Sequence, residues 1–148
     1  MSVCHDYVTL ATETFAIDNS VHMGIFVYPD TRKRRKGLEK TTAMFKALSD
    51  RTRLRIVNLL LEGELCVCEV MQVLGATQSK SSRHLTYLKN AGLVKHKRKR
   101  LWIYYSLTTP KNSVHRELLK AVRFSRKQNT LLRADLKKLP KVSRTRIC

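Results

Sequence analysis

Apolar residues recur at helical spacing over much of the chain between residues 39 and 139. The segments 39–48 and 51–62 each repeat their apolar positions about every 3.6 residues, which predicts two consecutive helices. Ser49 and Asp50, which lie between them, have side-chain oxygens that can cap a helix N-terminus. The second segment has the broader apolar face, so we expect it to lie at the centre of the core.

A short helix and then a more polar helix are predicted next. The first should end at Gly75, and its apolar residues keep one stripe: Val67, Val70, Met71 and Leu74. Thr77 suits the N-cap of the second helix, which should run to about Ala91. The outward positions of that helix are small, polar or basic, namely Gln78, Ser79, Ser82, Arg83 and Thr86. Two such helices joined by a glycine turn predict a helix-turn-helix whose second helix reads DNA.

A β-hairpin and a long helical pattern follow the helix-turn-helix. Residues 93–97 and 101–107 have strand character, with Lys99 and Arg100 at the hairpin tip. Residues 113–139 hold more apolar positions at helical spacing than one small domain can cover, so we expect them to form a dimer interface together with the first helix. The predicted fold class is mainly α with a small β-hairpin wing (α+β), a homodimeric winged helix-turn-helix.

The distribution of charge suggests a division into three parts. Residues 1–37 are interpreted as an N-terminal extension with a basic linker and no assigned structure, 38–139 as the winged helix-turn-helix DNA-binding and dimerisation domain, and 140–148 as a basic tail. All 30 Lys and Arg residues follow Thr31, and the formal net charge is +19. Such an excess of positive charge indicates a polyanionic partner, here double-stranded DNA. The basic run 32–36 is either a solvated linker or an arm along DNA phosphates.

Several classes of protein do not fit the sequence. No stretch approaches the ~18–20 apolar residues of a membrane span, and the N-terminus lacks the basic region of a signal peptide, so we expect a cytoplasmic protein without a membrane partner. No nucleophile with a matching base, glycine-rich phosphate loop or carboxylate pair is evident, and we therefore do not expect an enzyme. The four cysteines are expected to be thiols rather than a disulfide framework.

Cys66 and Cys68 are separated by one residue where the first helix of the helix-turn-helix should begin. Inside a regular helix their side chains would point about 200° apart, so chelation of one ion requires an irregular helix start. One interpretation is that both are small buried apolar side chains. The other is that both are thiolate ligands for a thiophilic ion such as As(III), Sb(III), Cd(II) or Pb(II).

Four stretches of the chain resemble the ArsR/SmtB family of metal-responsive repressors. They are Ala47–Ile56, the Glu-Leu-Cys-Val-Cys-Glu box at 64–69, Gln78–Leu85 with Gly92–Val94, and Trp102–Leu107. The resemblance implies a winged-helix homodimer that represses a resistance operon and leaves its operator when an ion binds. Within the arsenic-responsive branch, it implies an arsenite- or antimonite-responsive repressor whose inducer, As(III) or Sb(III), binds Cys66 and Cys68. No organic cofactor is implied.

The chain departs from the patterns of the family branches at several positions. The arsenic-responsive branch often has a third cysteine where this chain has Met71. A Cd(II)- or Pb(II)-responsive repressor would need N-terminal cysteines, of which this chain offers Cys4. The zinc-sensing branch uses acids and histidines on the last helix, where this chain has only His115, Glu117 and Asp135. A thiol redox-sensing repressor is a further alternative, although the spacing of Cys66 and Cys68 disfavours a disulfide between them.

The expected DNA contacts lie on the second helix of the helix-turn-helix and on the wing. Gln78, Ser79, Ser82 and Arg83 are expected nearest the bases, with Lys80, His84, Lys97, Arg98, Lys99 and Arg100 on phosphates. His84 is equally compatible with packing inside the helix-turn-helix. Trp102 and the tyrosines beside it are expected to pack within the wing. The family often has glycine at the wing tip, so we expect strain at Arg100 if the turn requires a positive φ.

Overall fold

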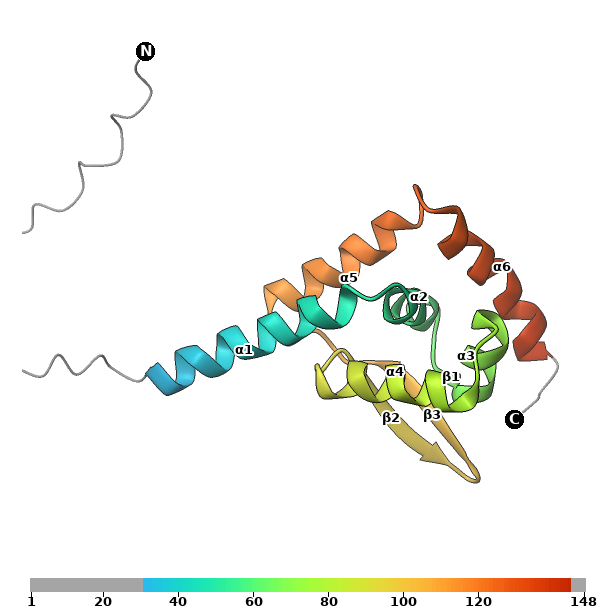
Figure 1. Cartoon of the computed structure of the whole chain (residues 1–148), viewed down its shortest axis with the longest axis horizontal. Helices are drawn as coiled ribbons and strands as arrows, with labels where there is room; N and C mark the ends of the chain where they lie inside the picture. Colours follow the sequence, from blue (N-terminus) through green and yellow to red (C-terminus); the bar gives the residue numbers. More distant parts are fainter. Residues whose placement is uncertain (1–30, 145–148) are drawn as a thin grey trace, which may run out of the picture.

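The computed structural model describes residues 31–144, with side chains described from residue 36 to residue 139. In chain order the elements are α1 (Thr31–Leu48), α2 (Arg51–Leu60), β1 (Leu65–Cys66), α3 (Val67–Leu74), α4 (Gln78–Asn90), β2 (Val94–Lys99), β3 (Trp102–Leu107), α5 (Ser113–Ser125) and α6 (Thr130–Arg144). In Figure 1, α2 lies centrally, the β2–β3 hairpin projects away from the helices, and α6 lies at the opposite end from the start of α1. No helix in this part of the chain is long and apolar enough to cross a bilayer.

The first two helices confirm the expectation that α2 is central. Its residues Ile56 to Leu60 are all buried, and it packs against α1, α3, α4, α5 and α6. Asp50 is the N-cap, and its carboxylate accepts a hydrogen bond of 2.9 Å from the backbone N–H of Arg53. The core therefore forms around α2, with α3 and α4 held against it.

Both expected domain boundaries fall inside helices. α1 begins at Thr31, so the basic run 32–36, interpreted as a linker, belongs to a helix. Lys and Arg have high helix propensity, which allows the helix to extend beyond its packed half. α6 continues to Arg144 and so passes the expected boundary at residue 140. The expectations for residues 1–30 and 145–148 lie outside the described residues.

The sheet has a strand that the sequence did not predict. The hairpin of β2 and β3 was expected, but β1 adds a third antiparallel strand in the order β1-β3-β2. Leu65 pairs with Tyr105, and Cys66 pairs with Tyr104. Because β1 has only two residues, it is too short to show the alternation that reveals a strand. The pairing joins the cysteine-containing segment directly to the wing.

The helical pattern after the wing is divided between two helices. We expected one helical pattern over residues 113–139, but α5 ends at Ser125 and α6 begins at Thr130. Asn129 explains the new start, because its side-chain oxygen accepts a hydrogen bond of 3.2 Å from the backbone N–H of Leu132. After this break, α6 folds back over α2 and α3.

A polar network fixes α6 to α2. Arg55 forms a bidentate ion pair with the fully buried Asp135, with N···O distances of 2.7 and 2.8 Å. Asn58 donates to the backbone oxygen of Leu132 at 3.1 Å and accepts from Arg126 at 2.5 Å. These contacts satisfy groups that would otherwise be buried without a partner. α6 is therefore an integral part of the protomer.

The docking of α6 accounts for the α6 part of the apolar surplus of residues 113–139 without a dimer, and leaves α5 and α1 for the expected interface. Leu132 is buried, and Leu136 and Leu139 pack against the core of the same protomer. Val122 is only 3% exposed and belongs to that core as well. A charge at Val122 would therefore disturb folding before it could report on a dimer.

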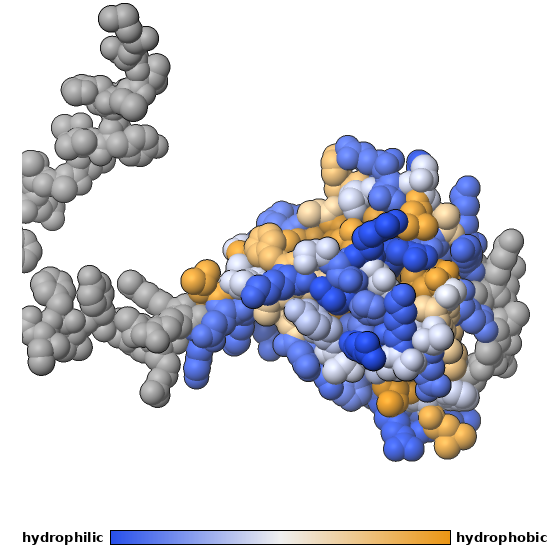
Figure 2. All heavy atoms as spheres, in the orientation of Figure 1, coloured by the Kyte–Doolittle hydropathy of each residue, from blue (hydrophilic) through white to orange (hydrophobic). Residues whose placement is uncertain are grey.

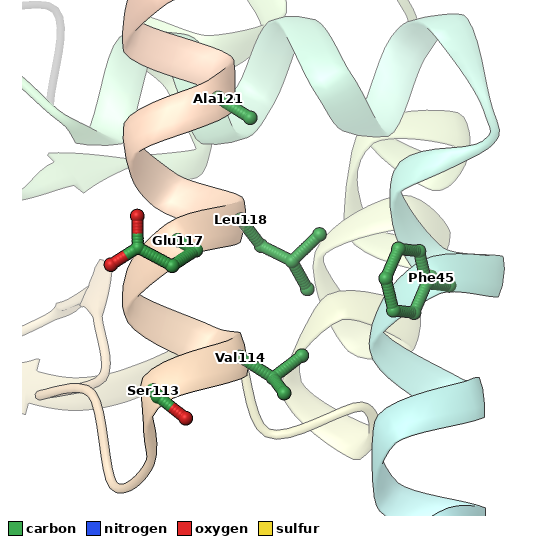
Figure 3. Close-up of a pocket in the computed structure, with 6 residues that line it drawn as sticks. All are labelled: Phe45, Ser113, Val114, Glu117, Leu118 and Ala121. Atoms are coloured by element: carbon green, nitrogen blue, oxygen red, sulfur yellow. The ribbon is translucent and has the colours of Figure 1, made fainter. Parts of the chain in front are cut away.

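An apolar groove lies between α1 and α5 on the surface of the protomer. Phe45 from α1 faces Val114 and Leu118 from α5, with Ala121 further along the same helix (Figure 3). Phe45 is 55% exposed. Hydrophilic side chains cover much of the face in Figure 2, while apolar side chains gather along the α1 and α5 side.

Removal of the positive partner of Asp135 should destabilise the fold strongly. The Arg55→Ala variant leaves a fully buried carboxylate without its bidentate partner, and we expect a loss of about 3 kcal/mol in the free energy of unfolding. Urea denaturation at a fixed protein concentration measures this loss. Arg133→Ala, which removes an exposed cation from α6, is the control and should leave the midpoint unchanged. Equal midpoints for the two variants would contradict the assigned role of the pair.

Candidate DNA interface and thiol site

Cys66 is both the last residue of β1 and the N-cap of α3. Its φ and ψ are −80° and 166°, which are extended values rather than helical ones. Its Sγ accepts a hydrogen bond of 3.5 Å from the backbone N–H of Glu69, while Glu69 Oε2 accepts one of 2.7 Å from the backbone N–H of Cys66. This reciprocal arrangement is a capping box with sulfur in the position where a hydroxyl is usual. Cys66 itself is 1% exposed and disulfide-bonded, which corrects the expectation that all four cysteines are thiols, so an ion can bind its sulfur only after reduction.

Cys68 lies two residues later, within the first turn of α3. It is a free, half-buried cysteine. The two cysteines therefore lie on either side of a junction between strand and helix. The divergence of about 200° therefore does not apply to this pair, because it holds only between two helical residues. The irregular start that chelation requires is already present at Cys66.

A third protein ligand does not lie beside the pair within the described residues. No group of three or more His, Cys, Asp or Glu side chains suited to an ion occurs in this part of the chain. Met71 is half-buried on α3, as expected for a residue of its apolar stripe. Cys4 and Cys148, the other two sulfur candidates, lie outside the described residues.

The positions expected for a zinc site on the last helix have other surroundings. His115 is 1% exposed, and its Nε2 has no hydrogen-bond partner in the described part of the structure. Burial lowers the pKa of this imidazole below its ordinary value. Asp135 is on α6 and is paired with Arg55, while Glu117 is exposed and contacts Lys120 at 3.0 Å. These side chains do not form a common ligand set.

α4 has the form expected of a DNA-reading helix. Thr77 is its N-cap, with the side-chain oxygen 3.4 Å from the backbone nitrogen of Lys80. Gly75 ends α3 in the left-handed conformation, with φ 63°, and this turn sets the angle between the two helices. The expected contact residues Gln78, Ser79, Lys80 and Arg83 are exposed, and Ser82 is half-buried.

His84 of α4 packs against the start of α2. Its Nδ1 lies 3.6 Å from Asp50 Oδ1, at the N-cap of α2. Burial raises the pKa of Asp50, but the hydrogen bond from the Arg53 backbone and the charges of Arg53 and His84 outweigh it, so that the net shift is downward. Of the two roles considered for His84, the geometry favours packing over a phosphate contact.

The wing presents its expected cations to solvent. Lys97, Arg98, Lys99 and Arg100 are all exposed. Arg98 Nε donates to the backbone oxygen of Arg100 at 3.2 Å, which holds the tip. Arg100 has φ 54°, as expected where the turn replaces the usual glycine. Lys99 forms an ion pair with Glu64 and lies 5.1 Å from the centroid of the Tyr104 ring.

The aromatic residues of the wing differ in exposure. Tyr105 is half-buried against the core, and this burial raises the pKa of its hydroxyl. Tyr104 is also half-buried, whereas Trp102 is 38% exposed. Packing within the wing therefore accounts for the two tyrosines better than for Trp102.

Comparisons with known proteins agree with this geometry. Residues 50–96 match the family model described as bacterial regulatory protein, arsR family. A Staphylococcus aureus cadmium resistance transcriptional regulatory protein, a CadC homolog, is 42% identical over 89 residues, which cover 55% of this chain and 74% of the relative. The arsenic resistance transcriptional regulator ArsR1 of Pseudomonas putida is 49% identical over 65 residues, covering 43% of this chain and 51% of that protein.

A solved structure shows the same fold. The homodimeric winged helix-turn-helix domain of Mb0332 from Mycobacterium bovis, described as a possible ArsR-family regulator, aligns with a TM-score of 0.56 and 27% identity, covering 67% of this chain and 92% of that one. The fold and the relatives are those of DNA-binding transcriptional regulators and not of enzymes. On this evidence the chain belongs to the ArsR family of bacterial regulatory proteins.

Proposed function

We propose that this chain is an arsenite- or antimonite-responsive repressor, located in the cytoplasm. It binds operator DNA as a homodimer and dissociates when Cys66 and Cys68 bind the metalloid. The observation that carries the proposal is that Cys66 Sγ caps the first helix of the helix-turn-helix. Any ion bound by this sulfur competes with the cap. The similarity to arsenic resistance regulators supports As(III) or Sb(III) as the ion.

Once a cellular thiol reductant has reduced Cys66, thiol exchange accounts for binding without a further redox step. Arsenite is As(OH)₃ at neutral pH, and each reduced thiol that binds forms an As–S bond while one hydroxide leaves with the thiol proton as water. Cys66 and Cys68 together replace two hydroxides and release two waters. The third position keeps its hydroxide or accepts a further thiol, for which Cys4 and Cys148 are candidates. Soft sulfur ligands also select such ions over oxygen-preferring ones.

The cap at Cys66 is well suited to reversible disruption. Sulfur is a weak hydrogen-bond acceptor, and its contact with the Glu69 backbone is long at 3.5 Å. When the ion takes the sulfur away, the first turn of α3 loses one of its cap contacts. Loss of an N-cap costs a helix about 0.5–2 kcal/mol. A typical coupling between an effector and DNA is about 1–3 kcal/mol, so this loss is large enough to supply much of the switch.

A Cd(II)-responsive repressor is the second candidate. It is favoured by the 42% identity with the CadC homolog, which is matched over 74% of its length. This function would require Cys4 as a further ligand. A mobility-shift titration of the operator complex with As(III), Sb(III), Cd(II), Pb(II) and Zn(II) separates the candidates. Full Cd(II) response that is lost in Cys4→Ser would establish the second one.

Induction should require both cysteines, while repression should require neither. We expect Cys66→Ser and Cys68→Ser to bind operator with wild-type affinity and to remain bound when arsenite is added. Mobility shifts in the presence of a thiol-free reductant measure both properties. Release of either variant at wild-type arsenite concentrations would show that the ligands lie elsewhere.

Two substitutions of Cys66 separate its capping role from its ligand role. Serine is a preferred N-cap, so Cys66→Ser should fold at least as stably as wild type. Cys66→Ala loses the acceptor and should lose about 0.5–2 kcal/mol in the free energy of unfolding. Urea denaturation provides the comparison. Both variants should fail to respond to arsenite, whatever their stability.

DNA recognition should depend on α4 and the wing in different ways. Arg83→Ala removes a proposed base contact and should cost ~1–3 kcal/mol in operator binding, with relaxed preference at one position. Lys97→Ala removes a proposed phosphate contact and should weaken all sequences alike, with a salt slope smaller by about 0.9. Lys137→Ala on α6 is the control. If Arg83→Ala and Lys137→Ala bind alike, α4 does not read the operator in this way.

The groove between α1 and α5 is the proposed dimer surface. A two-fold dimer places two α4 helices about one DNA turn apart, so the operator should be an imperfect inverted repeat. Phe45→Glu and Leu118→Glu place charge in the groove and should yield monomers with weak operator binding. Leu131→Glu changes a 37% exposed leucine of α6 and serves as the control. Light scattering measures the oligomeric state, and a dimer with Glu at Phe45 would contradict this surface.

A further inference from the structure

The segment that holds the first cysteine is attached to the wing at two points. Glu64 forms an ion pair with Lys99, near the wing tip. Two residues later, Cys66 is the β1 partner of Tyr104 in β3. Lys99 lies over the ring of that same tyrosine, 5.1 Å from its centroid. Leu65, between the two attachment points, is 5% exposed and pairs with Tyr105, so the segment 64–66 is anchored along its length.

We propose that Glu64 is an internal competitor of DNA for Lys99, and that this competition carries part of the effect of the ion from Cys66 to the wing. The inference rests on the proposed function, because it assumes that an ion at Cys66 weakens operator binding. It adds a route from the thiol site to DNA that bypasses α3 and α4. That route runs from Cys66 through β1 to the wing.

The Glu64–Lys99 ion pair is weak enough for a DNA phosphate to replace it. Its side chains are 43% exposed for Lys99 and 46% exposed for Glu64. Exposed pairs of this kind change an equilibrium constant by about fivefold at most. A DNA phosphate can therefore take Lys99 from Glu64 when the wing reaches the duplex. If the pair were deeply buried, a DNA phosphate could not displace Glu64 from Lys99. If Lys99 had no partner, Glu64 could not affect DNA binding.

Linkage sets the direction of the effect. An ion can lower DNA affinity only by favouring contacts that DNA must break. The Glu64–Lys99 pair is such a contact, since Lys99 cannot fully serve the carboxylate and a phosphate together. New bonds at Cys66 Sγ act on a segment that is paired with β3, so they shift Glu64 relative to Lys99. For this pair to carry part of the effect, Glu64 must hold Lys99 more firmly in the ion-bound form than in the ion-free form.

The Glu64→Gln variant tests the competition without any ion. We expect its operator affinity to rise about two- to fivefold, in keeping with an exposed pair. Its log–log salt dependence should steepen by no more than about 0.9, the value for one complete phosphate contact, because Lys99 already reaches a phosphate part of the time in the wild-type complex. Glu62→Gln is the matched control, because it removes the same charge two residues earlier, where the partner is Arg126 at 2.6 Å. In a Lys99→Gln background, Glu64→Gln should have no effect beyond that of the control.

The same variants with arsenite test the coupling. Arsenite should lower the operator affinity of the wild-type protein and of Glu62→Gln by the same factor. For Glu64→Gln this factor should be about two to five times smaller. Arsenite binding to the DNA-free variant shows that the thiol site is intact. The inference is overturned if Glu64→Gln matches Glu62→Gln without ion, or if its arsenite response equals that of wild type. Failure of wild type itself to release operator would count against the proposed function instead.

Discussion

The hydrogen bond from the backbone of Glu69 to Cys66 Sγ is half of the capping box that starts α3, the first helix of the helix-turn-helix. It lies at the one residue that belongs to both the sheet and the start of α3. Because α3 has only eight residues, its first turn is a large part of the helix. Few further turns remain to absorb a change in that turn. Under the proposed function, an ion at Cys66 would therefore act on the DNA-reading helix over a very short path.

The elements with a long, regular pattern could be predicted from the sequence. α2 showed a broad apolar face, α4 began at a clear cap in Thr77 and ended before Gly92, and the wing strands were flanked by polar turns. The cysteine pair was also found from sequence, because its position before a helix-turn-helix is unusual. In each case local side-chain chemistry and the tertiary contacts favour the same structure.

Other features depend on contacts between distant residues and left little local signal. The strand β1 exists because β3 offers it a partner, and two residues cannot show a period. The break between α5 and α6 lies at the capping residue Asn129, within the polar run 125–130 that interrupts the apolar spacing. The burial of Asp135 depends on its ion pair with Arg55, which precedes it by 80 positions in the chain. His84 showed two plausible roles in the sequence, and only its distance to Asp50 separates them.

At the wing tip, the type of residue affects both the backbone strain of the turn and the positive charge of the wing. Arg100 has φ 54°, a conformation that costs a side-chain-bearing residue roughly 1–2 kcal/mol and glycine almost nothing. The free protein therefore stores a small energy at the outermost point of its wing. A glycine there would relax the hairpin but would remove a cation from the position that reaches furthest from the helices. At position 100, glycine would therefore favour thermal stability, whereas arginine would favour binding to a polyanion.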